Sequence, residues 1–112
     1  MKLPTAVTSA MAMLLAVASS SVLSDRMDDG REAYAEACAR CHETGVGGAP
    51  VTRSEEDWVN RSGLWEAVMS EHANQGYLGM PARGGNARMS EYDVDAAAEY
   101  MLTITHPDLP RD

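Results

Sequence analysis

The chain has 112 residues, with 17 acidic side chains against nine basic ones and a net charge of −8. A chain of this length favours a single domain. Its acidic balance disfavours nucleic acids and anionic lipid surfaces as ligands, because like charges repel, and favours partners with a basic surface. Phe is absent and aromatic residues make up 5% of the chain, so its side chains alone would form only a small core.

Residues 1–24 have the pattern of a secretory signal peptide. They contain one charged residue, Lys2, and a short apolar stretch that ends at Ala18 and is followed by serines. Ala18 also closes an Ala-x-Ala pattern that fits a cleavage site. We therefore expect residues 1–18 to be removed, with the boundary falling between 18 and 24, and residues 25–112 to form the mature domain.

A retained membrane anchor is the alternative interpretation of this segment. The stretch 3–23 carries no charge and is just long enough to cross a bilayer. Its Thr and Ser residues make it less apolar than a typical spanning helix, so we favour cleavage. Cleavage would remove Lys2 and leave eight Arg against 17 acidic residues, a net charge of −9. We expect an exported protein, periplasmic in a bacterium, without membrane association after cleavage.

The first predicted helix begins at Asp29, which forms a capping-box pattern with Glu32. Small and aromatic residues then recur at helical spacing. One face of this helix presents Gly30, Ala33, Tyr34, Ala37, Cys38 and Cys41. That face therefore brings both cysteines of the chain to a common side.

The stretch Cys38-Ala39-Arg40-Cys41-His42 has the pattern of a covalent haem attachment site. Cys38 and Cys41 are three positions apart, so on a helical turn both thiols point to one side and can add to the two vinyl groups along one edge of a haem. His42 follows directly and can bind the iron as an axial ligand. A haem would also supply the large apolar body that the core lacks. We therefore predict one covalently attached haem c.

Two other kinds of site use a similar cysteine pattern. A thioredoxin-like redox pair needs a βαβ context, and half of a zinc site needs two further ligands with paired spacing. No βαβ pattern surrounds the motif, the chain has no other cysteine, and His72 and His106 are isolated in the sequence. We therefore favour haem attachment over both.

Two more helices are predicted in the middle of the chain. A Gly-rich loop follows the motif, after which Ser54 caps a short helix with Asp57 at its third position. A third helix opens at Ser62 or Gly63 and stops at Gly76. Its apolar stripe comprises Leu64, Trp65, Val68, Met69 and His72.

The last predicted helix follows an irregular loop over residues 77–88. Ser90 and Asp93 form a further capping-box pattern, and Pro107 ends the helical region. The apolar stripe of this helix comprises Val94, Ala97, Ala98, Met101 and Leu102. No strand pattern appears, so the sequence predicts an all-α domain of about four helices around one covalent haem.

A second axial ligand would make the haem iron six-coordinate. The candidates after the motif are Met69, Met80, Met89, Met101, His72 and His106. Met69 and Met101 lie on the apolar stripes of their helices, which assigns them to the core. For His72 and His106 we favour exposed positions or positions beside the haem propionates.

Met80 and Met89 are the two loop candidates. Met89 directly precedes the Ser90 cap and is placed to form a hydrophobic staple with Val94, which gives it a structural role. Met80 stands between a glycine and Pro81. The fixed φ of the proline and the small size of the glycine allow the thioether to turn toward a haem face. We favour Met80 and keep Met89 as the alternative.

From about Gly30 to Leu102 the chain resembles the class I mono-haem cytochromes c, in the small bacterial group often called cytochrome c-five. Besides the cysteine motif, the resemblance rests on Gly30 and Tyr34, on Gly47-Gly48-Ala49-Pro50, on Trp58 with Arg61, on Met80-Pro81-Ala82-Arg83-Gly84-Gly85, and on Ala97 to Met101. It implies the class I cytochrome c fold.

The resemblance also implies roles for individual residues. His42 and Met80 resemble the two axial ligands, and Pro50 resembles the proline whose carbonyl accepts the other ring N–H of the histidine. Trp58 and Arg61 are similar to residues beside the haem propionates, where an indole N–H and a guanidinium suit a carboxylate. Plain apolar packing explains Trp58 equally well.

Two more features come from the resemblance. Gly30, Tyr34 and Tyr100 resemble the residues at which the first and last helices cross. Some members of the group carry an extra cysteine pair near the methionine loop, whereas residues 86–88 hold none here. Packing and the bond to iron must therefore hold this loop.

These features together predict a soluble, exported electron carrier rather than an enzyme. Its expected partners are redox proteins with a basic docking surface, such as a periplasmic reductase or oxidase, and we expect a monomer. The alternatives are a haem-based small-ligand sensor and a cytochrome subunit of a membrane or periplasmic oxidoreductase complex.

Overall fold

The computed structural model describes residues 25–59 and 66–108. The predicted signal peptide, the start of the third predicted helix and Arg61 lie outside these residues. Within the two described ranges the regular elements are helices, and the only β-type pairing is an isolated bridge between Tyr77 and Met80. The all-α prediction is therefore confirmed for this part of the chain. No helix in the same ranges has the length and apolar character needed to cross a membrane.

The described chain begins with one helical segment over residues 25–42. Its α-helical start passes into a π-helical turn, η1 (Tyr34–Cys38), and then into α2 (Ala39–His42). In the π turn the N–H of Ala39 donates to the carbonyl of Tyr34, five residues earlier. A π turn adds a residue to the helix and so rotates the residues after it about the helix axis. The helix therefore changes phase directly at the cysteine motif.

The predicted start of this helix at Asp29 is wrong, because the helix already includes residues 25–28. Arg26 forms an ion pair with Glu99 of the last helix, and its guanidinium lies 5.2 Å from the centre of the Tyr92 ring. Asp29 accepts a hydrogen bond of 2.8 Å from the Tyr92 hydroxyl. These tertiary contacts hold an extra turn of helix against its neighbour, and the local capping pattern does not show them.

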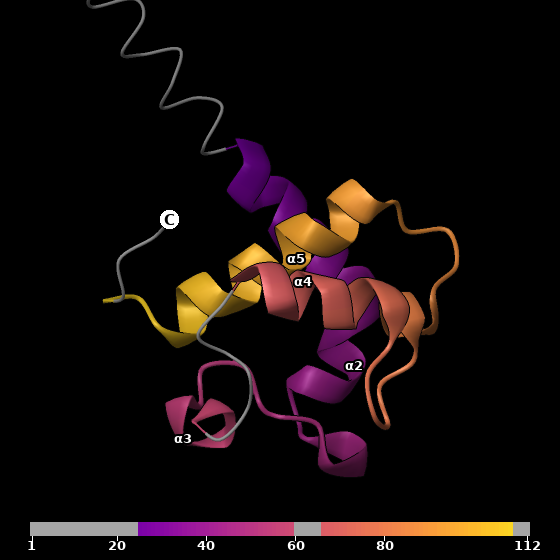
Figure 1. Ribbon diagram of the computed structural model, residues 1–112. Helices are drawn as coiled ribbons and strands as arrows, with labels where there is room; N and C mark the ends of the chain where they lie inside the picture. The colour runs from indigo at the N-terminus through magenta and orange to yellow at the C-terminus, as the bar shows by residue number, and fades with distance from the viewer. Residues whose placement is uncertain (1–24, 60–65, 109–112) are drawn as a thin grey trace, which may run out of the picture.

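Helix α5 (Glu91–Thr105) crosses this first segment (Figure 1), and the two backbones come closest at Gly30. A Cβ at Gly30 would lie 2.2 Å from the carbonyl oxygen of Ala96, so only glycine permits the approach. Tyr34 and Tyr100 pack beside the crossing, with ring centroids 5.4 Å apart. The crossing expected at Gly30, Tyr34 and Tyr100 is therefore confirmed. It also buries Ala96, which lies outside the predicted stripe.

The capping box predicted for α5 is complete. The Ser90 hydroxyl accepts a bond of 3.1 Å from the N–H of Asp93, and the Asp93 carboxylate accepts one of 3.4 Å from the N–H of Ser90. Met89 and Val94 are buried in one apolar cluster, as a hydrophobic staple requires. The buried stripe residues are Val94, Ala97, Ala98 and Met101, and Leu102 is half-buried.

Helix α3 (Glu55–Trp58) is a single turn without the predicted capping box. The helix begins directly after Ser54, as predicted, but the Ser54 side chain makes no capping hydrogen bond, so the capping-box prediction is wrong. The Asp57 carboxylate instead accepts a bond of 2.9 Å from the N–H of Val51. The preceding loop, which contains the short helix η2 (Val46–Gly48), folds back over the turn and takes the carboxylate that a capping box would use.

Helix α4 (Glu66–Gln75) packs along α5 in Figure 1. It stops where the sequence predicts: Gly76 has φ +86°, and its N–H donates to the carbonyl of His72 at 2.8 Å. The chain then turns back through the Tyr77–Met80 bridge and a last short helix, η3 (Ala82–Gly85), before α5. The loop after α4 is therefore folded against the helices at both its ends.

Replacing Gly30 by Leu should lower the free energy of unfolding by about 1–3 kcal/mol, because the new side chain overpacks the helix crossing. Chemical unfolding followed by circular dichroism measures this. Gly79→Ala is the control, since a Cβ at Gly79 has no atom within 4 Å. Equal unfolding curves for Gly30→Leu and the unchanged protein would contradict the close crossing.

Candidate functional site

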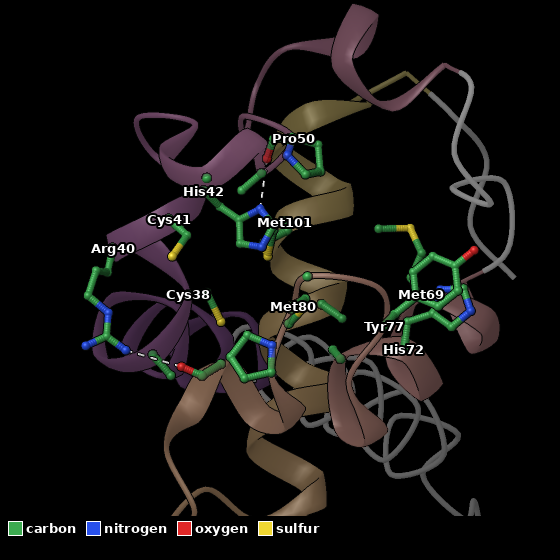
Figure 2. Close-up of a pocket in the computed structure, with 18 of the residues that line it drawn as sticks. Cys38, Arg40, Cys41, His42, Pro50, Met69, His72, Tyr77, Met80 and Met101 are labelled. Carbon is green, nitrogen blue, oxygen red and sulfur yellow. Dashed lines mark hydrogen bonds between the residues drawn. The ribbon is translucent and has the colours of Figure 1, made fainter.

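A cavity of about 830 Å³ lies between the first helical segment, α4, α5, the loop that contains η2 and the loop after α4. Its lining includes Cys38, Cys41 and His42 from the first segment and Met80 from the loop after α4. Figure 2 shows these side chains around one space. The volume is typical of a site for a sizeable organic ligand. The structure therefore brings together the two thiols, the imidazole and the thioether that the sequence analysis singled out.

The His42 ring is held in one orientation. Its Nδ1 lies 2.8 Å from the carbonyl oxygen of Pro50. A carbonyl can only accept, so Nδ1 carries the proton and Nε2 keeps its lone pair for a metal. The backbone carbonyl of His42 also accepts a bond of 2.8 Å from the N–H of Thr52. The bond that the resemblance implied between His42 and Pro50 is present, and His42 is 7% exposed.

The two cysteines are unpaired and half-buried. Burial, with a smaller contribution from Cys41, raises the pKa of the Cys38 thiol to about 11. In a redox-active cysteine pair, by contrast, the pKa of the reactive thiol is lowered below its ordinary value. The environment of Cys38 therefore disfavours a thiol oxidoreductase and suits a thiol that lies against an apolar group.

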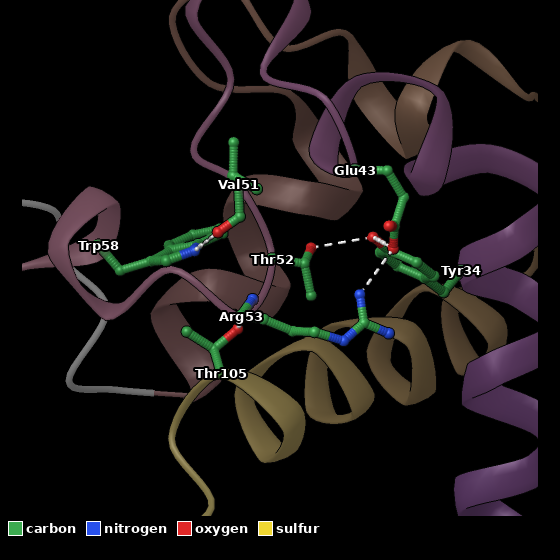
Figure 3. A network of polar contacts seen from close by, with 7 residues as sticks. All are labelled: Tyr34, Glu43, Val51, Thr52, Arg53, Trp58 and Thr105. Carbon is green, nitrogen blue, oxygen red and sulfur yellow. Dashed lines mark hydrogen bonds and ion pairs between the residues drawn. The ribbon is translucent and has the colours of Figure 1, made fainter.

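A polar network fixes the loop that carries Pro50 (Figure 3). The Tyr34 hydroxyl donates to the Glu43 carboxylate at 2.6 Å and lies 3.0 Å from the hydroxyl of Thr52. The Arg53 guanidinium forms an ion pair of 3.1 Å with Glu43, and the backbone N–H of Arg53 donates to the Thr105 hydroxyl at 3.0 Å. The loop is thus tied to both long helices. Sequence reasoning missed this network, because its members are scattered along the chain and none belongs to a motif.

Trp58 lines the same cavity and faces His42, with ring centroids 5.9 Å apart and planes inclined by 20°. Its indole N–H donates to the carbonyl of Val51 at 3.0 Å. In the structure this bond occupies the indole N–H and ties Trp58 to the loop, and the position of Trp58 beside a haem propionate stays a prediction. Arg61, its predicted companion, lies outside the described residues.

Four methionines line the cavity: Met69, Met80, Met89 and Met101. Met89 and Met101 belong to the buried apolar cluster, whereas Met80 is half-buried in a loop. His72 lines the cavity as well, and His106 instead approaches Glu55 at 4.0 Å. Met69, which the sequence analysis assigned to the core, is half-buried in α4 and also lies outside that cluster. The choice of the second ligand therefore stays a prediction, with Met80 favoured as the loop candidate.

Tyr34 generates a test of the network around the Pro50 loop. Burial, followed by the bond to Glu43, raises the pKa of Tyr34 from 10.0 to about 12. The folded state therefore holds this proton more tightly than the unfolded chain does. The resulting stability is complete below pH 10 and is lost as the pH rises toward 12. Tyr34→Phe should reduce the fall in unfolding free energy across that window in denaturant titrations, whereas Tyr92→Phe, at an exposed position, should change it less.

Comparisons with known proteins identify the family of this chain. Residues 25–101 match the family described as cytochrome C oxidase, cbb3-type, subunit III. Cytochrome c-551 of Halorhodospira halophila is 41% identical over 80 residues, which covers 67% of this chain and 97% of the relative. Cytochrome c-555 of Prosthecochloris aestuarii is 34% identical over 95 residues, covering 78% and 96%.

A solved structure gives the same result for the fold. A chain from the crystal structure of an electron-transfer complex of nitrite reductase with cytochrome c matches with a TM-score of 0.62 and 30% identity, over 69% of this chain and 94% of that chain. The class I cytochrome c fold expected from the resemblance is therefore confirmed. The chain belongs to the cytochrome c family, as a small class I mono-haem cytochrome c whose cofactor is haem c and whose relatives act in electron transfer.

Proposed function

We propose that this chain is an exported electron carrier with one haem c, attached through Cys38 and Cys41 and ligated by His42 and Met80. The observation that carries the proposal is that these four side chains line one cavity, with the imidazole already oriented by Pro50. When bound, haem c supplies an iron that takes up and releases one electron. In this proposal the protein breaks no substrate bonds and is not an enzyme.

The surrounding residues support this assignment. The bond from Nδ1 of His42 to Pro50 prevents rotation of the ring and raises the basicity of Nε2. Apolar side chains from α4 and α5, among them Met69, Ala98 and Met101, line the rest of the cavity. They would exclude water from the cofactor. Neutral ligands and a water-poor site favour a fairly high reduction potential.

A second candidate comes from the family match. The matching family is described as a subunit of a cbb3-type oxidase, so a cytochrome subunit of an oxidoreductase complex is the alternative to a free carrier. We favour the free carrier, because this chain matches 97% of the Halorhodospira halophila cytochrome c-551 and 96% of the Prosthecochloris aestuarii cytochrome c-555, and neither name mentions a complex. Purification of the native protein together with a larger oxidase would favour the subunit.

The intact mass of the native protein tests attachment and export together. We expect a denatured polypeptide that still carries the mass of one haem and lacks residues 1–18, or up to 24. Extraction with acid and organic solvent should leave the colour with the polypeptide. Haem that extracts freely would refute the attachment through Cys38 and Cys41, and a mass that includes residues 1–18 would refute the signal peptide.

Met80→Ala and Met89→Leu form a matched pair for the second ligand. Met80→Ala should abolish the weak far-red band of a ferric iron–methionine bond, lower the reduction potential and admit carbon monoxide. Met89→Leu should keep the far-red band, the reduction potential and the exclusion of carbon monoxide, because Leu can still pack on Val94 in the apolar cluster. The reverse result would assign the ligand to Met89. Fast carbon monoxide binding to the unchanged protein would instead indicate a small-ligand sensor.

The net charge predicts how the carrier meets its partner. With 17 acidic residues, we propose a partner with a basic docking surface, of the kind that a reductase or oxidase would offer. Attraction between opposite surfaces speeds association, and salt screens it. Electron transfer to a basic redox partner should therefore slow as ionic strength rises, in stopped-flow measurements. A rate that is independent of salt would show that docking is mainly apolar.

A further inference from the structure

We infer that His72 and Tyr77 form a positioning pair that holds Met80 at the cofactor site, an inference that rests on the proposed role of Met80 as a ligand. The two rings lie parallel, with centroids 3.7 Å apart and an angle of 4° between their planes. Both residues line the same cavity as Met80. Figure 2 shows the two stacked rings beside Met69 on one side of this cavity. Neither residue belongs to the attachment motif.

The backbone links Tyr77 directly to Met80. The N–H of Tyr77 donates to the carbonyl of Met80 at 3.0 Å, and the N–H of Met80 donates back to the carbonyl of Tyr77 at 2.9 Å. This pair of bonds closes a tight turn through Leu78 and Gly79. The backbones of Tyr77 and Met80 are therefore held together, and a contact that restrains Tyr77 also restrains Met80.

The turn is strained and needs support from outside. Leu78 has φ +52°, a left-handed conformation that favours glycine, and its side chain is 85% exposed. Leu78 thus makes few contacts that could offset the strain. The stack of Tyr77 on His72 is a side-chain contact between this turn and α4.

His72 provides a firm support because α4 is anchored to α5. The Asn74 side-chain amide donates to the Asp95 carboxylate at 2.9 Å. Directly after the helix, Gly76 turns the chain back on itself: a Cβ there would lie 3.0 Å from the N of Ala82 and 3.1 Å from the carbonyl oxygen of Met80. The loop therefore returns close against the end of α4, which brings Tyr77 over His72.

The other end of the loop is held against the helix that carries the cysteines. A Cβ at Gly84 would lie 2.6 Å from the carbonyl oxygen of Ala37. The Arg40 guanidinium donates to the carbonyl of Gly84 at 3.3 Å. Both cysteines of the chain belong to the haem motif, so no disulfide constrains this loop. On the side of α4, the His72–Tyr77 stack restrains the loop instead.

The test measures how often Met80 leaves the iron. Excess imidazole binds the ferric protein only after the methionine bond opens, so its binding rate reports that opening. Tyr77→Ala and His72→Ala should each raise this rate by about threefold to tenfold, as expected for the loss of an aromatic stack, and should lower the reduction potential. Tyr77→Phe and His72→Phe keep two stacked flat rings and should stay within about twofold of the unchanged protein.

Tyr92→Ala is the matched control, because Tyr92 and Tyr77 are 47% and 48% exposed. Its hydroxyl bonds to Asp29 on the first helical segment, and it does not line the cavity. It should leave the imidazole rate unchanged. The double variant His72→Ala/Tyr77→Ala should be no faster than either single variant, because both remove the same contact. If the two substitutions raise the imidazole binding rate multiplicatively in the double variant, the two rings act separately and the stack is not what supports Met80.

Two results separate this inference from the proposed function. A far-red band that is present in the unchanged protein and lost in Met80→Ala would establish Met80 as the ligand. If the rate of imidazole binding is then the same in Tyr77→Ala as in the unchanged protein, the positioning role is refuted. If the band is absent from the unchanged protein or survives Met80→Ala, Met80 is not the ligand and both proposals fall. Unchanged rates in the Phe variants with faster rates in the Ala variants support the positioning role.

Discussion

The contact of Gly30 with the backbone of Ala96 sets the distance between the two helices that frame the site. Because no side chain separates them there, the first helical segment and α5 approach closely, and Tyr34 and Tyr100 pack beside the contact. The first segment carries the two cysteines and His42, while α5 forms a wall of the cavity. A change in this crossing would therefore move the attachment residues relative to the cavity that they line.

The two loops that face the cavity are held by different kinds of interaction. The Pro50 loop is held by hydrogen bonds and an ion pair, through Tyr34, Glu43, Thr52 and Arg53. The loop with Met80 is held by a backbone bridge, an aromatic stack, two close glycine contacts and a hydrogen bond from Arg40. The first arrangement fixes the orientation of His42 through a chain of directional bonds. The second has fewer side-chain hydrogen bonds and relies more on packing, which is consistent with our proposal that the stack controls how often the bond from Met80 to iron opens.

The net negative charge and the apolar cavity have separate roles in the proposed carrier. The charge acts at long range, before contact with a partner, and salt screens it. The cavity acts at short range, where exclusion of water would set the reduction potential of the cofactor. Substitutions of exposed carboxylates should therefore alter encounter with partners, whereas substitutions beside the cavity should alter the cofactor itself.

Local patterns in the sequence were sufficient for the attachment motif, the all-α class, the capping box at Ser90 and the end of α4 at Gly76. These features depend on residues that are close in the chain, so their spacing alone determines them. The same reasoning placed a helix start at Asp29 and a capping box at Ser54, and both predictions failed. In each case a distant or returning segment supplied the contact that decided the structure, through Arg26 with Glu99 and through Val51 with Asp57.

The sequence by itself therefore determined which residues could attach and ligate a haem, because that chemistry depends on residue type and short spacing. Only the tertiary structure decided how those residues are held. The π turn at Tyr34, the network around Thr52 and the stack of Tyr77 on His72 depend on how helices cross and loops return. Those arrangements arise from close packing between segments that lie far apart in the chain or on opposite sides of a turn, so local sequence patterns do not predict them.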